Sequence, residues 1–284
     1  MKHFFLIINR EKDREGKVTA RVRDYLKKKG AVCVCCSGCA EQKASYRYTD
    51  PAEIPPETEC VIVLGGDGTL IQAARDLVHT DYPLLGINMG TLGYLAEVDL
   101  LSIEQTLDCL LENRFYLEKR MMLCGRIYRD GALLREDVAL NDIVISRSGR
   151  LCVLHYHVMV DGEPLNDYLA DALITSTPTG STAYNMSAGG PVVSPQASLF
   201  VLTPVCSHSL NARSIVLPDS VKISVETVGE MKYPDLECLA TFDGDGPIRL
   251  FPGDLVEITK ANCITRLIKL SRVSFLETLR RKMI

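Results

Sequence analysis

Short apolar runs alternate with amphipathic segments along the first part of the chain. Runs at residues 4–8, 31–36, 61–64 and 83–88 have the length of buried β-strands. Segments 17–29, 70–78 and 102–113 carry apolar positions at helical spacing, and 37–59 reads as a polar, proline-containing connection. Strands that alternate with helices predict a parallel sheet with right-handed crossovers, here over residues 1–119.

After about residue 120 the pattern changes to short runs rich in β-branched residues. They are separated by turn signals, and Asp161-Gly162 is a strong hairpin signal. We therefore expect a mostly antiparallel β domain over 120–271, and a last helix within 272–284 that packs back on the first domain. The expected strands are 125–128, 142–146, 152–160, 172–176, 221–228, 237–242 and 255–259.

Length and composition narrow the class of protein. The 284 residues suffice for two domains, and the apolar share of 46% is ordinary for a globular protein. A net charge of −4 argues against a nucleic-acid partner, and the lack of an 18-residue apolar run argues against a membrane span. The first ten residues lack a cleavage pattern and read as a buried strand, so we expect a cytoplasmic protein.

Four of the eleven cysteines lie close together, at Cys33, Cys35, Cys36 and Cys39. This spacing lacks both a second CxxC pair and a histidine at zinc-finger distance. We interpret the cluster as a cysteine-rich strand in a reducing compartment and expect no metal site there.

The sequence Gly65-Gly66-Asp67-Gly68-Thr69 joins a buried strand to a helix. Such a turn places bare backbone N–H groups and the positive end of a helix together, which favours a phosphate. The carboxylate of Asp67 would repel a phosphate, unless it binds a metal or takes a proton from an attacking hydroxyl group. The alternative is a tight connection in which Asp67 or Thr69 caps the helix.

A second segment, residues 176–191, is dense in hydroxyl groups, glycines and a tyrosine (Tyr184). Hydroxyl and free N–H groups suit phosphate and ribose oxygens, whereas the alternative is a polar loop after a strand. Taken alone, Asn141-Asp142 and Asp243-Gly244-Asp245-Gly246 are first of all turn signals.

Together these segments resemble the NAD kinase family. Gly65-Gly66-Asp67-Gly68-Thr69, Asn141-Asp142, the block Thr177-Pro178-Thr179-Gly180-Ser181-Thr182-Ala183-Tyr184 and Cys206-Ser207-His208-Ser209-Leu210 occur in the order and rough spacing of that family. The resemblance covers residues 60 to about 283. Its glycine motif is shared with diacylglycerol kinases, sphingosine kinases and phosphofructokinases, and the threonine-rich block is the specific part.

The resemblance implies a Rossmann-like α/β domain followed by a β-rich domain. It also implies transfer of the γ-phosphoryl group of ATP, with Mg²⁺, to the 2′-hydroxyl of the adenosine ribose of NAD. Asp67 would be the catalytic residue, and Gly66, Gly68, Thr69 and Gln72 would contact ATP. The residues expected to bind NAD are Asp67, Gly68, Asn141, Asp142, Asp171, Thr182, Ala183, Tyr184, Asn185, Ser187 and Asp245.

Several positions depart from the family pattern. Asp142 replaces the usual Glu, Gln72 a frequent basic residue, and Asp245 a usual Gln. Two alternatives therefore stay open: a lipid or sugar kinase with the same glycine turn, and a non-catalytic NAD-binding sensor. The resemblance also implies a homodimer or homotetramer, in which a neighbouring subunit supplies part of the adenosine site.

Overall fold

The computed structural model describes residues 1–35, 49–90, 93–96, 98–149, 153–209, 212–228, 236–270 and 274–283. Its contacts divide the chain into two compact units, which we describe separately. Unit 1 is Met1–Arg120 with Ile264–Ile284, and unit 2 is Met121–Cys263. The sequence analysis had assigned residues 264–271 to the second domain. They belong to unit 1 because the end of strand β16 (Leu255–Lys269) pairs with β4 (Leu84–Asn88), Leu267 opposite Leu84.

The sheet of unit 1 is parallel, in the order β2-β1-β3-β4. Its first three strands are β1 (His3–Ile8), β2 (Val32–Cys35) and β3 (Cys60–Gly65). Every residue of β3 and β4 is buried, which explains their continuous apolar runs, since both faces of the sheet are covered by helices. The cluster around Cys33 and Cys35 continues to Cys36 and Cys39, which lie outside the described residues.

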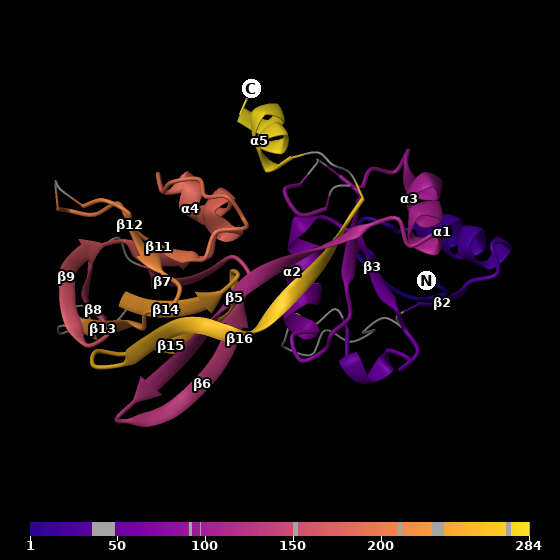
Figure 1. The fold of residues 1–284 in the computed structure, drawn as a ribbon. Helices are drawn as coiled ribbons and strands as arrows, with labels where there is room; N and C mark the ends of the chain where they lie inside the picture. The colour runs from indigo at the N-terminus through magenta and orange to yellow at the C-terminus, as the bar shows by residue number, and fades with distance from the viewer. Residues whose placement is uncertain are drawn as a thin grey trace. The chain divides into compact units, whose positions relative to one another are not determined.

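Three helices cover this sheet: α1 (Lys17–Lys28), α2 (Asp67–Asp76) and α3 (Ile103–Leu111). Helices α1 and α3 lie side by side and contact each other (Figure 1). They share one core cluster with alternate residues of β1 and β3. Helix α2 packs on the opposite face, where a side chain on Gly86 would crowd Leu70. The short helix η1 (Pro51–Glu53) lies in the connection expected to be irregular.

The last helix, α5 (Phe275–Met283), belongs to unit 1. The ammonium group of Lys282 lies 3.9 Å from the centre of the Tyr94 ring. Such a cation–π contact attaches α5 to the loop that follows β4.

Unit 2 is built from antiparallel strands. One sheet has the order β12-β11-β10-β7-β14-β15, and the other contains β16-β13-β8-β9 with β5 and β6. The strands are β5 (Tyr116–Arg129), β6 (Ala132–Ala139), β7 (Asp142–Gly149), β8 (Leu154–Val160), β9 (Glu163–Ala170), β10 (Ala172–Ser176), β11 (Leu199–Val205), β12 (Ile215–Pro218), β13 (Ile223–Val228), β14 (Leu236–Phe242) and β15 (Asp245–Leu250).

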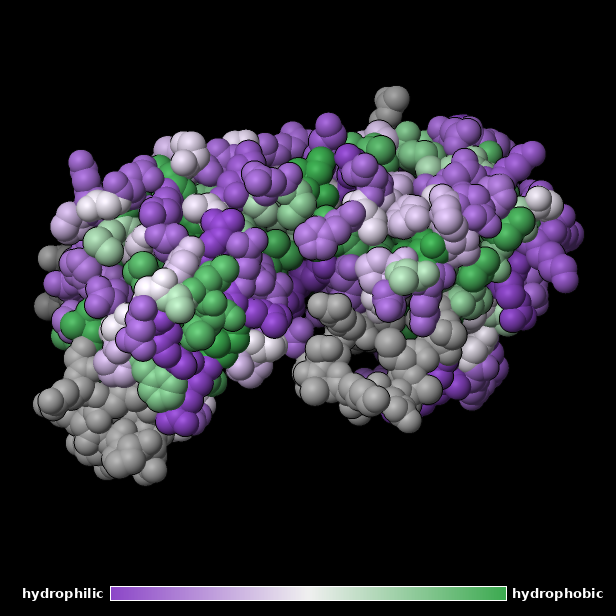
Figure 2. All heavy atoms as spheres, turned by 90° about the horizontal axis from the view of Figure 1, so that it is seen from below, coloured by the Kyte–Doolittle hydropathy of each residue, from purple (hydrophilic) through white to green (hydrophobic). Residues whose placement is uncertain are grey.

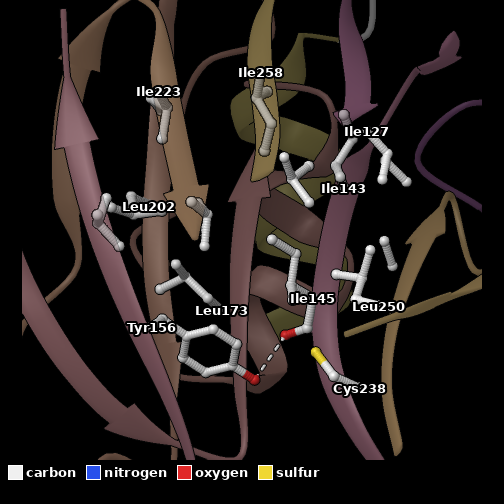
Figure 3. Packing of buried hydrophobic residues seen from close by; sticks show 14 of the residues in the cluster. Ile127, Ile143, Ile145, Tyr156, Leu173, Leu202, Ile223, Cys238, Leu250 and Ile258 are labelled. Atoms are coloured by element: carbon white, nitrogen blue, oxygen red, sulfur yellow. Dashed lines mark hydrogen bonds between the residues drawn. The ribbon is translucent and has the colours of Figure 1, made fainter. Parts of the chain in front are cut away.

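The larger apolar cluster in the core of unit 2 includes Ile143, Ile145, Tyr156 and Leu173 (Figure 3). The Tyr156 hydroxyl group donates to the Ile145 carbonyl oxygen at 3.3 Å, which satisfies its polar end inside this core. The face of the molecule drawn in Figure 2 is mainly hydrophilic, with apolar patches between. No helix within the described residues is long and apolar enough to cross a membrane.

The expected fold class, a parallel α/β domain followed by a β-rich domain, is confirmed. The β8–β9 hairpin also forms at Asp161 and Gly162, which both have positive φ. Strands β6, β9, β11, β12 and β15 were missed, and β5 and β16 are much longer than the expected 125–128 and 255–259.

Candidate functional site

The glycine turn lies between β3 and α2, at the carboxyl edge of the parallel sheet. Gly66 is the N-cap of α2 and Asp67 its first helical residue. The Thr69 hydroxyl group accepts from the Gly66 N–H at 3.5 Å, so Thr69 helps to cap the helix and Asp67 is not its N-cap. A side chain on Gly65 would overlap Thr69, whose hydroxyl group accepts a hydrogen bond from Asn9 Nδ2 at 3.0 Å. The first N–H groups of a helix have no intrahelical acceptor and remain able to bind an anion.

Asp67 turns its carboxylate toward the loop after β4. Oδ2 accepts from the Tyr94 N–H at 2.7 Å, and Oδ1 accepts from the N–H groups of Leu95 at 3.2 Å and Ala96 at 3.0 Å. A side chain on Gly93 would overlap the carboxylate, so this loop must approach as bare backbone. A carboxylate has about four acceptor positions, so three donors fix its orientation and leave room for a further partner.

The other predicted ATP-contacting side chain, Gln72, lies further along α2. Its amide donates to Asp76 Oδ1 at 2.8 Å, one turn further on. Its role in ATP binding stays a prediction.

In unit 2, Asp243 holds the Asn141-Asp142 turn. Its carboxylate accepts from the backbone N–H groups of Leu140 at 2.8 Å, Asn141 at 2.7 Å and Asp142 at 3.1 Å. Asp243 itself has a φ of 53° at the turn between β14 and β15. What the sequence analysis read as a hairpin signal is therefore also the clamp of a predicted binding turn.

The threonine-rich block packs directly on this turn. The Thr177 hydroxyl group donates to the Leu140 carbonyl oxygen at 2.6 Å, and the Thr177 N–H donates to the Asn141 carbonyl oxygen at 2.8 Å. A side chain on Gly180 would overlap the backbone of Asn141. The structure thus joins two predicted binding segments that are more than thirty residues apart.

The block continues into two short helices, η2 (Gly180–Thr182) and α4 (Tyr184–Ser187). Tyr184 is 44% exposed, Ser187 is exposed, and Thr182 and Ala183 are half-buried. These side chains remain accessible to a ligand.

Asn185 differs from its neighbours. It is fully buried, its amide donates to the carbonyl oxygens of Ser181 and Pro191, and its Oδ1 accepts from the Thr203 hydroxyl group at 2.7 Å. Because its side-chain amide bonds within the protein, Asn185 anchors the block. Its contact with NAD stays a prediction.

Asp171 lies at the other end of the same sheet. In the antiparallel pairing of β7 with β10, Ser176 lies opposite Asp142, whereas Ala172 lies opposite Ser146. Four residues of strand separate the two ends, which is about 14 Å. Within one chain, Asp171 therefore does not lie close to the Asn141 turn. It forms a two-point ion pair with Arg147, whose Nε donates at 2.8 Å and which lowers the pKa of the carboxyl group.

The carboxyl group of Asp142 is 5% exposed. Burial, and next the nearby negative charge of Asp243, raise the pKa of Asp142 to about 7. Asp245, in contrast, is partly exposed and accepts from the N–H of Gly246 at 2.7 Å, so its binding role stays a prediction.

The described residues contain no cluster of three or more His, Cys, Asp or Glu side chains that could hold a metal ion. Mg²⁺ commonly keeps several water ligands and binds through substrate phosphates and one or two carboxylates. The side chains present therefore fit a metal that arrives with a nucleotide and is held mainly by its phosphates and by water, rather than by a set of protein carboxylates.

Sequence reasoning missed Lys12, Arg147, Asp243 in its clamping role, and the loop of residues 93–96. Lys12 Nζ lies 2.7 Å from the position of a Cβ atom built on Gly66. Lys12 follows the first strand at the same sheet edge as the glycine turn, and that position was the available signal. The N–H donors of the loop carry no side-chain signature.

The family models and the relatives that match this chain all point to one family. A family model described as the ATP-NAD kinase N-terminal domain matches residues 4–115, and one described as the ATP-NAD kinase C-terminal domain matches residues 140–270. A protein named NAD kinase from Lachnospira eligens is 46% identical over 297 aligned positions and covers 100% of both chains. An NAD kinase from Agathobacter rectalis is 41% identical and covers 100% of this chain and 99% of its own.

Two solved structures share the fold. A yeast NADH kinase, crystallised with NADH, has a TM-score of 0.84 at 23% identity and covers 100% of this chain and 87% of its own. An NAD kinase from Archaeoglobus fulgidus, crystallised with ATP, has a TM-score of 0.75 at 22% identity and covers 100% of both chains.

Proposed function

The chain belongs to the NAD kinase family, and we propose that it transfers the γ-phosphoryl group of ATP to the 2′-hydroxyl group of the adenosine ribose of NAD, giving NADP and ADP. The observation that carries this proposal is the packing of the threonine-rich block on the Asn141-Asp142 turn. The block is the specific part of the resemblance, and Thr182, Ala183 and Tyr184 follow closely after Gly180, which lies against the backbone of Asn141.

We assign the phosphate-binding role to the glycine turn of unit 1. The N–H groups of the first turn of α2, at Gly66 and Gly68, suit the phosphates of ATP. Mg²⁺, when bound with the nucleotide, would neutralise charge on the transferred group. Thr69 supports the turn from within through its bond with Asn9.

Asp67 is our candidate for the catalytic residue. Its carboxylate is held by three backbone N–H groups and has one further acceptor position, which we assign to the ribose hydroxyl group. From there it would orient that hydroxyl group and accept its proton as the oxygen attacks the γ-phosphorus.

The binding of NAD is assigned to unit 2. We propose that Asn141 and Asp142 contact the ribose and nicotinamide side. Thr182, Ala183, Tyr184 and Ser187 would surround the adenosine. The exposed ring of Tyr184 offers an aromatic face to the base.

Replacement of Asp67 tests this assignment. Asp67→Asn should lower kcat by roughly 100- to 10,000-fold, because a positioned base contributes about that much. The assay couples purified protein, ATP and Mg²⁺ with NAD, and records ADP and NADP. Asp24→Asn, which removes an exposed carboxylate of the same unit, is the matched control. A near-native rate in Asp67→Asn, with the protein folded and NAD bound, would remove Asp67 from the mechanism.

The same assay separates the alternatives. A lipid or sugar kinase would phosphorylate such an acceptor and leave NAD unchanged. A non-catalytic sensor would bind NAD without releasing ADP. NADH as a parallel substrate measures whether the reduced dinucleotide is also accepted.

A further inference from the structure

We propose that Lys12 binds the phosphate chain of the nucleotide donor at the glycine turn. This inference rests on the proposed function and adds a charged residue to its donor site. Lys12 comes after β1, in a loop to which the sequence analysis assigned no role.

The loop is built so that this side chain reaches the turn. Asn9 donates its backbone N–H to the Leu64 carbonyl oxygen at 2.9 Å, which ties the loop to the end of β3. The carbonyl oxygen of Asn9 accepts from the N–H groups of Lys12 and Asp13, and its Nδ2 donates to Thr69 inside the turn. One residue thus connects the backbone of Lys12 with the first turn of α2.

Asp13 fixes the far end of the loop. Its carboxylate accepts from the Thr19 N–H at 2.8 Å and from the Thr19 hydroxyl group at 2.6 Å. With both ends held, the exposed Lys12 side chain extends from a defined backbone position.

The ammonium group lies above two glycines. Lys12 Nζ is 2.7 Å from a Cβ atom built on Gly66 and 3.5 Å from one built on Gly90. These glycines follow β3 and β4, so the cation lies over the sheet edge at which parallel sheets bind their ligands. A side chain at position 66 would displace it.

The charges at this edge favour an anion. No ion pair found among the described residues involves the Lys12 ammonium group. The nearby carboxylate of Asp67 faces the N–H groups of residues 94–96. The positive end of α2 and a lysine side chain therefore combine at one place, and charge-assisted bonds to phosphate are stronger than neutral ones.

A lysine at this position is suited to phosphates rather than to a base or a sugar. Its ammonium group is a compact point charge on a flexible stem, which can follow the phosphate chain during transfer. Lysine has the same use over the phosphates of other nucleotide-binding loops.

The test compares Lys12→Met, Lys12→Arg and the control Lys17→Met. Lys17 is 80% exposed, is paired with Glu15, and carries the same charge at the end of the same loop. Initial rates are measured against ATP at saturating NAD and against NAD at saturating ATP. Binding of ATP and AMP is measured separately by calorimetry.

We expect Lys12→Met to raise the KM for ATP by about tenfold or more and to leave the KM for NAD within about twofold. Its affinity for ATP should fall while its affinity for AMP stays unchanged. Lys12→Arg should recover part of the loss, and Lys17→Met should resemble the wild type. Thermal melting of each variant checks folding, which an exposed side chain should not affect.

Two results would overturn the inference: an unchanged KM and affinity for ATP in folded Lys12→Met, or a rise confined to the KM for NAD. Loss of the proposed function is a separate outcome. If the wild type makes no NADP from NAD and ATP, the ATP and AMP binding arms still decide the role of Lys12.

Discussion

Asp142 combines burial with a nearby like charge, and both disfavour its ionised form. Asp142 is 5% exposed, and the carboxylate of Asp243 accepts from the backbone N–H of Asp142 at 3.1 Å. Asp243 needs its charge to hold three N–H groups. Burial, and next the negative charge of Asp243, therefore raise the pKa of Asp142 to about 7.

This predicts a pH-dependent cost in stability. Because the folded pKa of Asp142 lies above its unfolded value, the native state retains a proton that the unfolded chain loses from about pH 4. Stability then falls as pH rises through this window, and levels off above about pH 7. Asp142→Asn cannot ionise, so it should be more stable than the wild type at pH 8, by on the order of 1–4 kcal/mol.

Thermal melts of both proteins from pH 5 to pH 9 measure this difference. Asp245→Asn, which removes a partly exposed carboxylate after the same turn, is the control and should show no such trend. Equal melting temperatures of wild type and Asp142→Asn at pH 8 would contradict the prediction.

The sequence located such residues better than it explained them. The positions of Asp67, Asn141 and Asp142 follow from local turn chemistry, which a single sequence shows. That Asp243 clamps residues 140–142 depends on the pairing of β14 with β7, about a hundred residues apart. The burial of Asn185 could not be predicted, because a buried amide and an exposed one have the same sequence signature.

At the scale of elements, the loop of residues 93–96 completes the start of α2. It supplies three N–H donors to Asp67, and Lys269 of β16 donates to its Leu95 carbonyl oxygen at 3.4 Å. The loop can lie this close only because position 93 is a glycine. The carboxylate and the loop therefore fix each other.

Gly93→Ala should disturb both the Asp67 carboxylate and the loop of residues 93–96. The added methyl group overlaps the Asp67 carboxylate, so one or more of the three hydrogen bonds must break, at about 1–3 kcal/mol for a buried group left unpaired. We expect a lower melting temperature and a lower kcat. Gly68→Ala is the stability control, since a Cβ atom there meets nothing within 4 Å and alanine favours the helix.

A double-mutant cycle makes this prediction specific. If the clash with Asp67 is the cause, Gly93→Ala should cost much less stability in an Asp67→Ala background. Equal costs in both backgrounds would show that the strain lies elsewhere in the loop.

The sequence patterns predicted the elements whose burial follows one pattern along their whole length. Strands β3 and β4 are buried throughout, and α1 has one apolar stripe. Strand β6 was missed because its first five residues are all exposed. Its buried and exposed positions therefore do not alternate as in a half-buried strand. Strand β16 was cut short because it pairs with β13 in unit 2 and with β4 in unit 1, and its burial pattern changes on the way.

At the scale of the whole molecule, unit 2 carries its predicted NAD contacts at two ends of one sheet. Asp142 and the threonine-rich block lie at one end of β7 and β10, and Asp171 with Arg147 lies at the other. About 14 Å of strand separates these ends. If Asp171 contacts the dinucleotide as the resemblance implies, it reaches a site whose block comes from a neighbouring copy of the chain.

This predicts a homo-oligomer with sites shared between copies, and two inactive variants that complement each other. Light scattering should give two or four times the mass of one chain.

Asp171→Ala and Tyr184→Ala should each be impaired alone, because each removes one proposed contact from every site. In a mixed dimer with two-fold symmetry, one site carries both defects and the other carries none. Co-expressed variants should therefore regain up to about a quarter of the wild-type activity, since about half of the dimers are mixed and each has one intact site. A monomeric protein, or a mixture no more active than the better single variant, would place Asp171 outside the site.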